Sequence, residues 1–404
     1  MFRDPADLDV TFRFAEVSAL LGNFESAVSA LERMLLFNPD LPRVRLELGV
    51  LYFRLGSYAL ARTYLTRALE SEDVPTEVQA RVEVFLAEID ERLSPHQFSG
   101  SIYSGLRYQS NANSGPSSTA VRAAGVDAVL DSQFTRKSDG NVFVSGNVQY
   151  LFDTQTQEAT VWETNGFFYV TEQEREDQVD LLLFALDVGP RASLPSDLVP
   201  GASVRPYLTT DQIWLGKSHF LQSVGIGVTV DKQYPGNAST EIDFRFRIRD
   251  FESNSANATA TGQNGAETQL RIGGNYVPAE RWTLGGFGQV RKQEAKKDKN
   301  GNIEYLLSVT AARNYVAPFA LTDAPWTSSF TTSLAYTRYD VPDPLVDPGK
   351  TRREHEYRMN FLTAVPISND WTIIGTLART VQDANLANFR FRNNAATIGA
   401  SWRF

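Results

Sequence analysis

The sequence predicts an α+β multidomain protein, in which an N-terminal helical repeat solenoid precedes a C-terminal antiparallel transmembrane β-barrel of about 14 strands. Three observations predict this fold class. Residues 1–93 repeat small and aromatic positions every 34 residues, which is typical of stacked helix pairs. Residues 94–404 contain segments in which apolar and polar residues alternate with period two, as strands do. The chain ends on the alternating segment ATIGASWRF, which stops at an aromatic residue.

Composition limits the classes of protein. The net charge of −9 argues against a nucleic-acid partner, because phosphate binding needs a basic surface. The absence of cysteine excludes disulfides and thiolate metal sites, and it suits an oxidising compartment such as the bacterial periplasm. No apolar run approaches the roughly 18 residues of a membrane-spanning helix. Strand alternation would still allow a barrel to span a membrane.

The helical part contains two copies of one motif, offset by 34 residues. The aligned positions are Gly22, Phe24, Ala27, Leu31 and Met34 in the first copy, and Gly56, Tyr58, Ala61, Leu65 and Ala68 in the second. Small residues let paired helices approach, and the aromatic residue fills the space between them. The motif resembles the tetratricopeptide repeat (TPR). Residues 75–93 predict a capping helix.

Two repeats and a cap fall below the roughly three repeats that a solenoid needs for stability. No signal peptide precedes the first repeat, so we expect this helical domain, residues 1–93, to be truncated. TPR stacks bind peptides along the concave face of their first helices. The alignment predicts that this partner-binding face contains Phe12, Glu16, Arg43, Leu46, Val50 and Arg54. A scaffold that only docks on the barrel mouth is the alternative.

The clearest strand is EIDFRFRIRDF, residues 241–251. Ile242, Phe244, Phe246 and Ile248 share one face, and charged residues occupy the other. In a membrane barrel the apolar face contacts lipid and the charged face lines the lumen. A soluble sandwich or propeller is disfavoured, because so many long strands keep their polar residues on one parity. Long polar connectors, such as 251–265, are expected opposite the helical domain, and tight turns are expected beside it. Connectors 190–202 and 315–325 are longer than this rule predicts.

Charged residues on the lumen parity predict a pore lining. The predicted residues are Asp243, Arg245, Arg247, Arg249, Arg271 and Arg291. Glu241, Glu267 and Glu304 are placed to neutralise the arginines. The favoured interpretation is a structural charge ladder, and the alternative is a selective pore wall.

The chain shows little catalytic chemistry. It has three histidines, His96, His219 and His355, and none has the spacing of a metal motif. Ser218 adjoins His219, but adjacent residues of a strand point to opposite faces. No glycine-rich phosphate loop links a strand to a helix. We therefore expect no enzyme activity, no cofactor and no metal.

The last strand carries an assembly signal. Thr397, Gly399, Trp402 and Phe404 fit the polar-x-Gly-x-x-aromatic-x-aromatic pattern, which resembles the β-signal of outer-membrane barrels. This resemblance implies recognition by the barrel-assembly machinery. An ordinary closing strand with an aromatic end is the alternative.

The whole architecture resembles the surface lipoprotein assembly modifier (Slam) family. Tyr108, Asn111 and Asn113 in GSIYSGLRYQSNANSGPSS match that family's first strand and Asn-rich loop, and VRPYLTTDQIWLG looks like a mid-barrel strand. The resemblance implies a Gram-negative outer-membrane barrel, residues 94–404, with its helical domain in the periplasm. It also implies contact with outer-membrane lipid and lipopolysaccharide, and export of a periplasmic client protein or lipoprotein to the cell surface. An exopolysaccharide-export porin and a passive porin or structural barrel are the alternatives.

Overall fold

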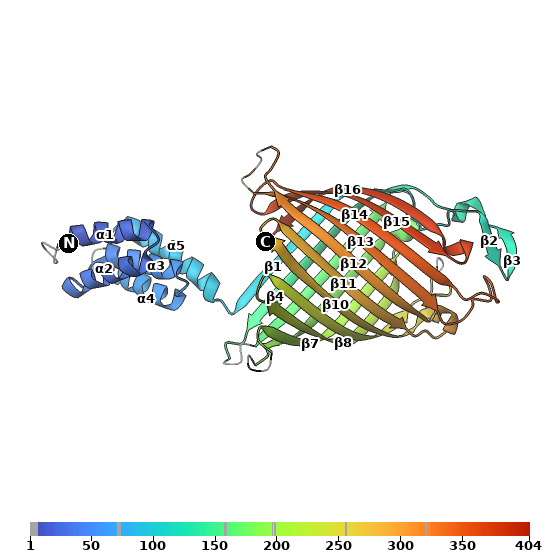
Figure 1. Cartoon of the computed structure of the whole chain (residues 1–404), viewed down its shortest axis with the longest axis horizontal. Coiled ribbons are helices and arrows are strands. Elements are labelled where there is room, and N and C mark those ends of the chain that lie inside the picture. The colour runs from blue at the N-terminus through green and yellow to red at the C-terminus, as the bar shows by residue number, and fades with distance from the viewer. Residues whose placement is uncertain are drawn as a thin grey trace. The chain divides into compact units, whose positions relative to one another are not determined.

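The structure is a computed structural model, which describes residues 7–70, 74–156, 160–195, 197, 199–254, 257–319, 322 and 324–404. The chain divides into two compact units, Met1–Pro95 and His96–Phe404 (Figure 1). Among the described residues, no helix combines the length and the apolar character that crossing a bilayer requires.

The first unit consists of paired helices. They are α1 (Leu8–Leu20), α2 (Phe24–Phe37), α3 (Pro42–Arg54), α4 (Tyr58–Leu69) and α5 (Thr76–Leu93). Gly22 and Gly56 follow α1 and α3 at φ +77° and +74°, where a side chain would be strained. A Cβ on Gly49 would lie 2.5 Å from Leu65 Cγ, so this glycine lets α3 and α4 touch. The repeat prediction is confirmed, because its aligned alanines, leucines and Met34 are all buried.

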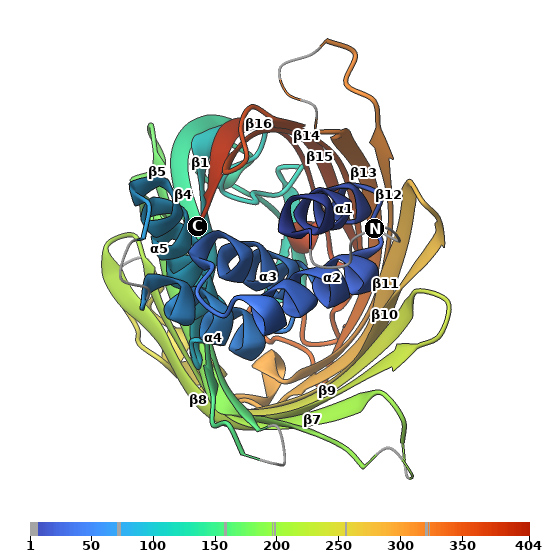
Figure 2. The same ribbon diagram turned by 90° about the vertical axis from the view of Figure 1, so that its left-hand side faces the viewer.

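The second unit is a closed antiparallel barrel of 14 strands, as predicted. Its strands are β1 (His96–Gln109), β4 (Asp139–Asp153), β5 (Val161–Gln173), β6 (Leu181–Ser193), β7 (Ala202–Leu215), β8 (Ser218–Tyr234), β9 (Ala238–Phe251), β10 (Gly265–Ala279), β11 (Trp282–Gln293), β12 (Asn302–Tyr315), β13 (Trp326–Tyr339), β14 (Arg353–Pro366), β15 (Trp371–Ala384) and β16 (Phe391–Arg403). Each strand pairs with its sequence neighbour, and β1 pairs with β16 to close the ring (Figure 2). The strands have 12 to 17 residues, more than the roughly 9–11 that a tilted membrane strand needs.

The connector after β1 contains a hairpin that the sequence analysis did not predict. Strands β2 (Ala120–Ala123) and β3 (Val126–Val129) pair with each other outside the barrel sheet (Figure 1). Arg122 is held by an ion pair to Asp347 (Nε to Oδ2, 3.1 Å), and Asn388 bonds the Arg122 backbone on both sides. The hairpin therefore links the loops that follow β1, β13 and β15.

The two faces of the barrel differ in chemistry. Ile242, Phe244, Phe246 and Ile248 point outward and are 37–55 % exposed. Large apolar side chains are exposed on the other strands as well, for example Leu208, Leu307 and Leu377. Moving one such side chain out of water stabilises a protein by about 1.5–3 kcal/mol. A surface with so many of them requires an apolar surrounding.

The two rims of the barrel also differ. At the end where β1 begins, which we call the His96 end, the connectors 235–237, 280–281 and 367–370 are short, whereas 194–201 and 316–325 are longer, as the sequence indicated. The opposite, Gln109 end carries the longer connectors 110–138, 252–264 and 340–352, with the tight turn 216–217 as an exception. Five tryptophans have the outward parity at the His96 end, namely Trp162, Trp282, Trp326, Trp371 and Trp402. Interfacial tryptophans belong at such a rim.

Candidate functional site

The barrel lumen gathers all six residues that the sequence predicts as pore lining. Asp243, Arg245, Arg247 and Arg249 alternate along β9, and their neighbours on the outward parity are the apolar residues of that strand. Arg271 on β10 pairs in register with Asp243, so it has the same inward parity. Arg291 on β11 shares this parity and pairs with Glu304 on β12 (Nη2 to Oε2, 2.9 Å).

Arg247 is the centre of the β7–β10 wall. It forms ion pairs with Asp211 on β7 and with Glu267 on β10. The Glu267 side chain is only 2 % exposed, and Arg249 approaches it from the other side at 3.8 Å. Burying a charge is costly unless it is paired. These ion pairs link neighbouring strands across the lumen wall, as in the structural charge ladder that was the favoured interpretation of the arginines.

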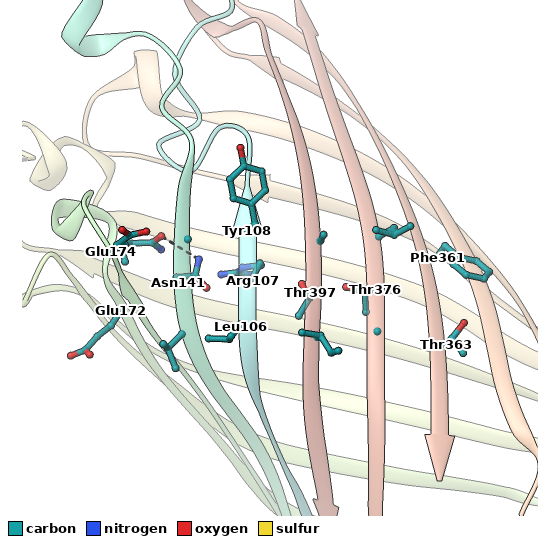
Figure 3. A pocket seen from close by; sticks show the side chains of 17 residues that line it. Leu106, Arg107, Tyr108, Asn141, Glu172, Glu174, Phe361, Thr363, Thr376 and Thr397 are labelled. Carbon is teal, nitrogen blue, oxygen red and sulfur yellow. Dashed lines mark hydrogen bonds between the residues drawn. The ribbon is translucent and has the colours of Figure 1, made fainter. Parts of the chain in front are cut away.

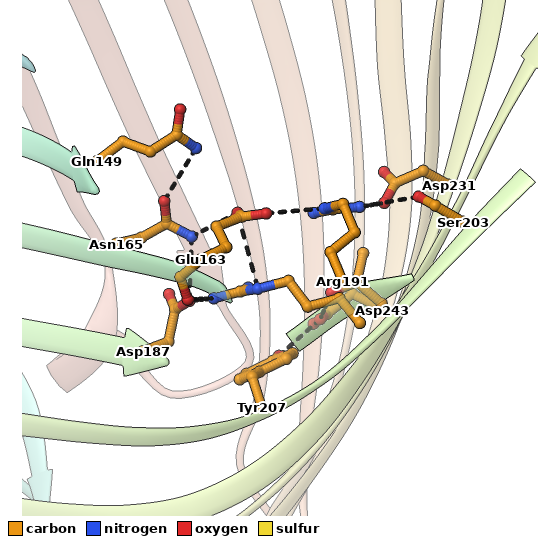
Figure 4. Close-up of polar contacts among 11 residues, drawn as sticks. Gln149, Glu163, Asn165, Asp187, Arg191, Ser203, Tyr207, Asp231 and Asp243 are labelled. Carbon is orange, nitrogen blue, oxygen red and sulfur yellow. Dashed lines mark hydrogen bonds and ion pairs between the residues drawn. The ribbon is translucent and has the colours of Figure 1, made fainter. Parts of the chain in front are cut away.

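A second cluster of polar groups continues the ladder over β5–β9 (Figure 4). Arg191 donates to Glu163 (Nε to Oε2, 2.7 Å) and also pairs with Asp231. Arg205, which is 4 % exposed, pairs with Asp187. The Tyr207, Thr229 and Arg245 side chains then join this cluster to Asp243, with Tyr207 Oη donating to its Oδ2 at 2.6 Å.

Sequence reasoning missed this second cluster, although the signal was present. Glu163 and Asn165 share one parity of a predicted strand, and Asp187 stands between Leu186 and Val188 in the next. Which carboxylate meets which arginine depends on register and on side-chain reach across three strands, and alternation alone gives neither. Arg271 differs from the other arginines, because its guanidinium stacks on Phe287 at 4.0 Å from the ring centroid.

The helical unit brings together five of its six predicted partner-binding residues. Phe12, Glu16, Val50 and Arg54 line a cavity of about 90 Å³ between α1, α3 and α5. The Arg43 guanidinium lies 5.6 Å from the Phe12 ring centroid. This cavity is far smaller than the roughly 300–1,000 Å³ of small-molecule sites, so it suits a single inserted side chain.

The placement of Leu46 corrects the predicted set. Leu46 is 0 % exposed and packs in the core of α3, α4 and α5. Its position on the helix turns it toward α4 and α5, so it stabilises the unit and offers no surface to a partner.

A half-buried polar triad supports the same helices. The hydroxyls of Tyr52 and Tyr64 both donate to Glu32 Oε1, at 2.9 and 3.2 Å, and their rings stack at 5.4 Å. Burial, together with the hydrogen bond to the Glu32 carboxylate, raises the pKa of Tyr52 to about 12. Burial likewise raises the pKa of Tyr64.

The histidines are engaged in ordinary contacts. His219 makes hydrogen bonds through both ring nitrogens, to Glu252 (2.8 Å) and to Gln212 (2.9 Å). His355 lies on the outward parity and contacts the Tyr336 ring at 4.9 Å. Within the described residues, no cluster of three or more His, Asp or Glu side chains is arranged to hold a metal ion.

The predicted assembly signal lies on β16 and just beyond it. Thr397 and Gly399 face the lumen, whereas Trp402 and Phe404 lie on the opposite parity, with their rings 4.9 Å apart. The Phe404 ring also stacks on Phe98 of β1 at 5.6 Å, and Phe404 exchanges backbone hydrogen bonds with Gly100. The aromatic end of the chain therefore fastens the last strand to the first.

The outward face contains one large hollow, of about 860 Å³, across β14, β15, β16, β1 and β4 (Figure 3). Its walls include Leu106, Phe361, Leu377 and Ile398, and Gly375, which has no side chain, lies at its base. The apolar lining makes it part of the surface that needs an apolar surrounding.

Comparison with known proteins adds one family. Residues 18–81 match the tetratricopeptide-repeat family model. The match covers part of the helical unit and none of the barrel. No curated protein sequence matches the chain.

Three solved structures illustrate the similarity, and each aligns with 76 % of this chain. A bacterial polysaccharide outer membrane secretin has a TM-score of 0.37 and 6 % identity, covering 76 % of this chain and 98 % of its own. An anion-selective porin from Comamonas acidovorans has a TM-score of 0.37 and 8 % identity, covering 76 % and 99 %. The outer membrane channel DcaP of Acinetobacter baumannii has a TM-score of 0.41 and 8 % identity, covering 76 % and 97 %. TM-scores of 0.37 to 0.41 carry no information about the location or function of this chain.

Proposed function

We propose that this chain is an outer-membrane translocation channel of a Gram-negative bacterium, whose helical repeats capture a client in the periplasm and whose barrel passes it to the cell surface. The observation that carries this proposal is the closed barrel with an apolar outside and a charged, hydrogen-bonded inside. A bilayer supplies the apolar surrounding that the outward face needs, and closure leaves no unpaired strand edge in lipid.

The rims support one orientation. Bacterial barrels have short periplasmic turns and longer extracellular loops. Most of the short connectors lie at the His96 end, where the strand that follows the helical unit begins. The proposal therefore assigns the His96 end and the helical unit to the periplasm, and the hairpin of β2 and β3 to the cell surface.

The repeat face supports client capture. Phe12 offers apolar surface beside Glu16 and Arg54. Val50, which is 6 % exposed, lines the cavity beneath them, and this cavity accepts one side chain. Such a groove suits an extended peptide segment of a client. The resemblance to the Slam family makes a surface lipoprotein or an exported protein the first candidate client.

Polysaccharide export is the second candidate function, and a specific observation favours it. The lumen wall of β13, β15 and β16 is lined by small neutral groups such as Ser333, Thr331, Thr376 and Ala395. Small neutral side chains would let an uncharged polymer pass along this wall without a steric or electrostatic barrier. A passive porin is the third candidate, and it would need no client at all.

Two experiments separate these functions. The full chain, reconstituted into planar bilayers, is expected to give discrete conductance steps. Deletion of the gene is expected to remove a client from the cell surface, and assays of surface lipoproteins and of secreted polymer identify its class. Conductance without any loss of an exported client would contradict translocation and leave the passive porin.

A further inference from the structure

The lumen contains a cavity of about 750 Å³ on the wall of β1 and β4–β7. This volume lies within the roughly 300–1,000 Å³ of small-molecule sites. Phe167 on β5 points into it and is 42 % exposed, although the groups around it are polar. The Phe167 ring stacks on no other aromatic ring of the described residues, so its exposed face is available to a ligand.

The charged groups on the strand wall of this cavity are already engaged, and two further charged residues, Asp370 and Arg403, line its His96 end. Asp187 forms an ion pair with Arg205, and Asp211 forms one with Arg247. Arg245 donates to Tyr207 Oη at 3.1 Å. An ionic ligand would have to compete with these partners, whereas an uncharged ligand would leave them in place.

Two amides beside the ring retain hydrogen-bonding capacity. Asn147, the cross-strand neighbour of Phe167, accepts from Ser101 Oγ through its Oδ1 (2.6 Å), and its amide nitrogen has no acceptor among the described residues. The Gln149 amide nitrogen donates to Asn165 Oδ1 (3.2 Å), as Figure 4 shows. The Gln149 amide oxygen accepts no hydrogen bond from any residue that the structure describes. One free donor and one free acceptor therefore flank the ring.

Aromatic side chains continue from this point toward the Gln109 end. Tyr169 follows Phe167 on the same face of β5, and Tyr103 and Phe143 form an edge-to-face pair 4.9 Å apart on the adjacent strands. The Arg107 guanidinium lies 5.8 Å from the Tyr169 ring and 5.9 Å from the Phe143 ring. The rings of Phe167, Tyr169 and Tyr103 thus follow one another along the lumen wall, and Phe143, which is 4 % exposed, packs against Tyr103.

We propose that this strip of rings, with Phe167 at its exposed end, is a binding site for an uncharged carbohydrate chain. A sugar ring presents an apolar C–H face, which stacks on an aromatic ring, and hydroxyls that both donate and accept. Phe167 supplies the platform, Asn147 the donor and Gln149 the acceptor. The site lies in the proposed channel and deepens that proposal by naming a substrate class, so it favours the second candidate client over the first.

The test is titration calorimetry of the full chain in a detergent without a sugar headgroup, which does not require the barrel to conduct. The probes are maltohexaose, cellohexaose and tetra-N-acetylchitotetraose, with a polyethylene glycol of similar size and a Gly-Ser peptide as controls. At least one oligosaccharide is expected to bind, and Phe167→Ala should weaken it about tenfold, the size of one stacking contact. Asn147→Ala should weaken it as well.

The matched control is Phe184→Ala, which removes an aromatic ring of similar exposure from the outward face of the next strand. It should leave the affinity unchanged, and heat-modifiable gel mobility verifies that every variant is folded. Should Phe167→Ala fail to fold, Phe167→Leu keeps the volume and removes the ring. Binding of no oligosaccharide, equal binding by Phe167 variants and wild type, or preference for the peptide would overturn the proposal. Sugar binding by a chain that gives no conductance would overturn the channel and leave the site standing.

Discussion

Gly105 on β1 and Gly399 on β16 lie directly opposite each other in the seam that closes the barrel. A Cβ on Gly399 would lie 2.3 Å from the Ser104 carbonyl oxygen and 2.8 Å from Tyr103 Cε2. The Tyr103 ring covers this glycine, and at this one pair neither strand carries a side chain. This contact explains the glycine of the C-terminal pattern by geometry, apart from any recognition by an assembly machine.

Gly399→Val is expected to impair closure, because the added atoms would collide with backbone. The variant should lose heat-modifiable mobility and accumulate unassembled. Gly375→Val on β15 is the matched control, since a Cβ there meets nothing within 4 Å. Normal folding of Gly399→Val would show that the seam tolerates side chains.

The sequence predicted most of the barrel, for a physical reason. Alternation reports directly which face of a strand meets an apolar surrounding, and so the 14 strands and the inward parity of Arg245 and Arg271 followed from it. Leu46 was wrongly assigned to the binding face. A repeat alignment locates a residue along a helix only to within about one turn, and within one turn a side chain can change from exposed to buried. The β2–β3 hairpin was missed because its turn has Ala124 at φ +47°, where Asn or Gly is usual.

Arg247→Gln is expected to destabilise the barrel by about 3–5 kcal/mol, because it removes the nearest cation from the buried Glu267 carboxylate and leaves it with Arg249 at 3.8 Å and the Gln293 amide. Urea unfolding in micelles, followed by tryptophan fluorescence, measures this loss. Arg175→Gln is the control, since its side chain is 71 % exposed. Equal stability of the two variants would mean that the charge ladder does not support the barrel.

The same Arg247→Gln variant tests the pore wall. Removal of one positive charge from the lumen should shift the reversal potential in a KCl gradient toward cation selectivity. An unchanged reversal potential would restrict the arginines to a structural role.

The Tyr52 hydroxyl makes the stability of the helices depend on pH. Its folded pKa of about 12 lies above the ordinary value of 10.0, so folding favours the protonated form. That contribution is fully present below pH 10 and is lost as the pH rises toward 12. In Tyr52→Phe, the helix signal in the circular dichroism of the full chain should fall less between pH 10 and pH 12 than it does in the wild type. Parallel pH curves for the variant and the wild type would contradict the assignment.

Arg54→Glu is expected to weaken client capture, because it reverses the charge beside the apolar surface of Phe12. Cross-linking of the periplasmic fraction in living cells should lose the client band by roughly tenfold, as one central charged contact can contribute about 1.4 kcal/mol or more. Arg13→Glu is the matched control on the exposed side of α1. Loss of the band in both variants would indicate a general charge effect.

Topology in the cell tests the central claim most directly. Protease sites are inserted after Asn300, in a connector of the Gln109 end, and after Glu280, in a turn of the His96 end. Protease added to intact cells should cut the first site and spare the second, and both should be cut after lysis. Cleavage of the Glu280 site alone in intact cells, or of neither site, would contradict an outer-membrane barrel in the proposed orientation.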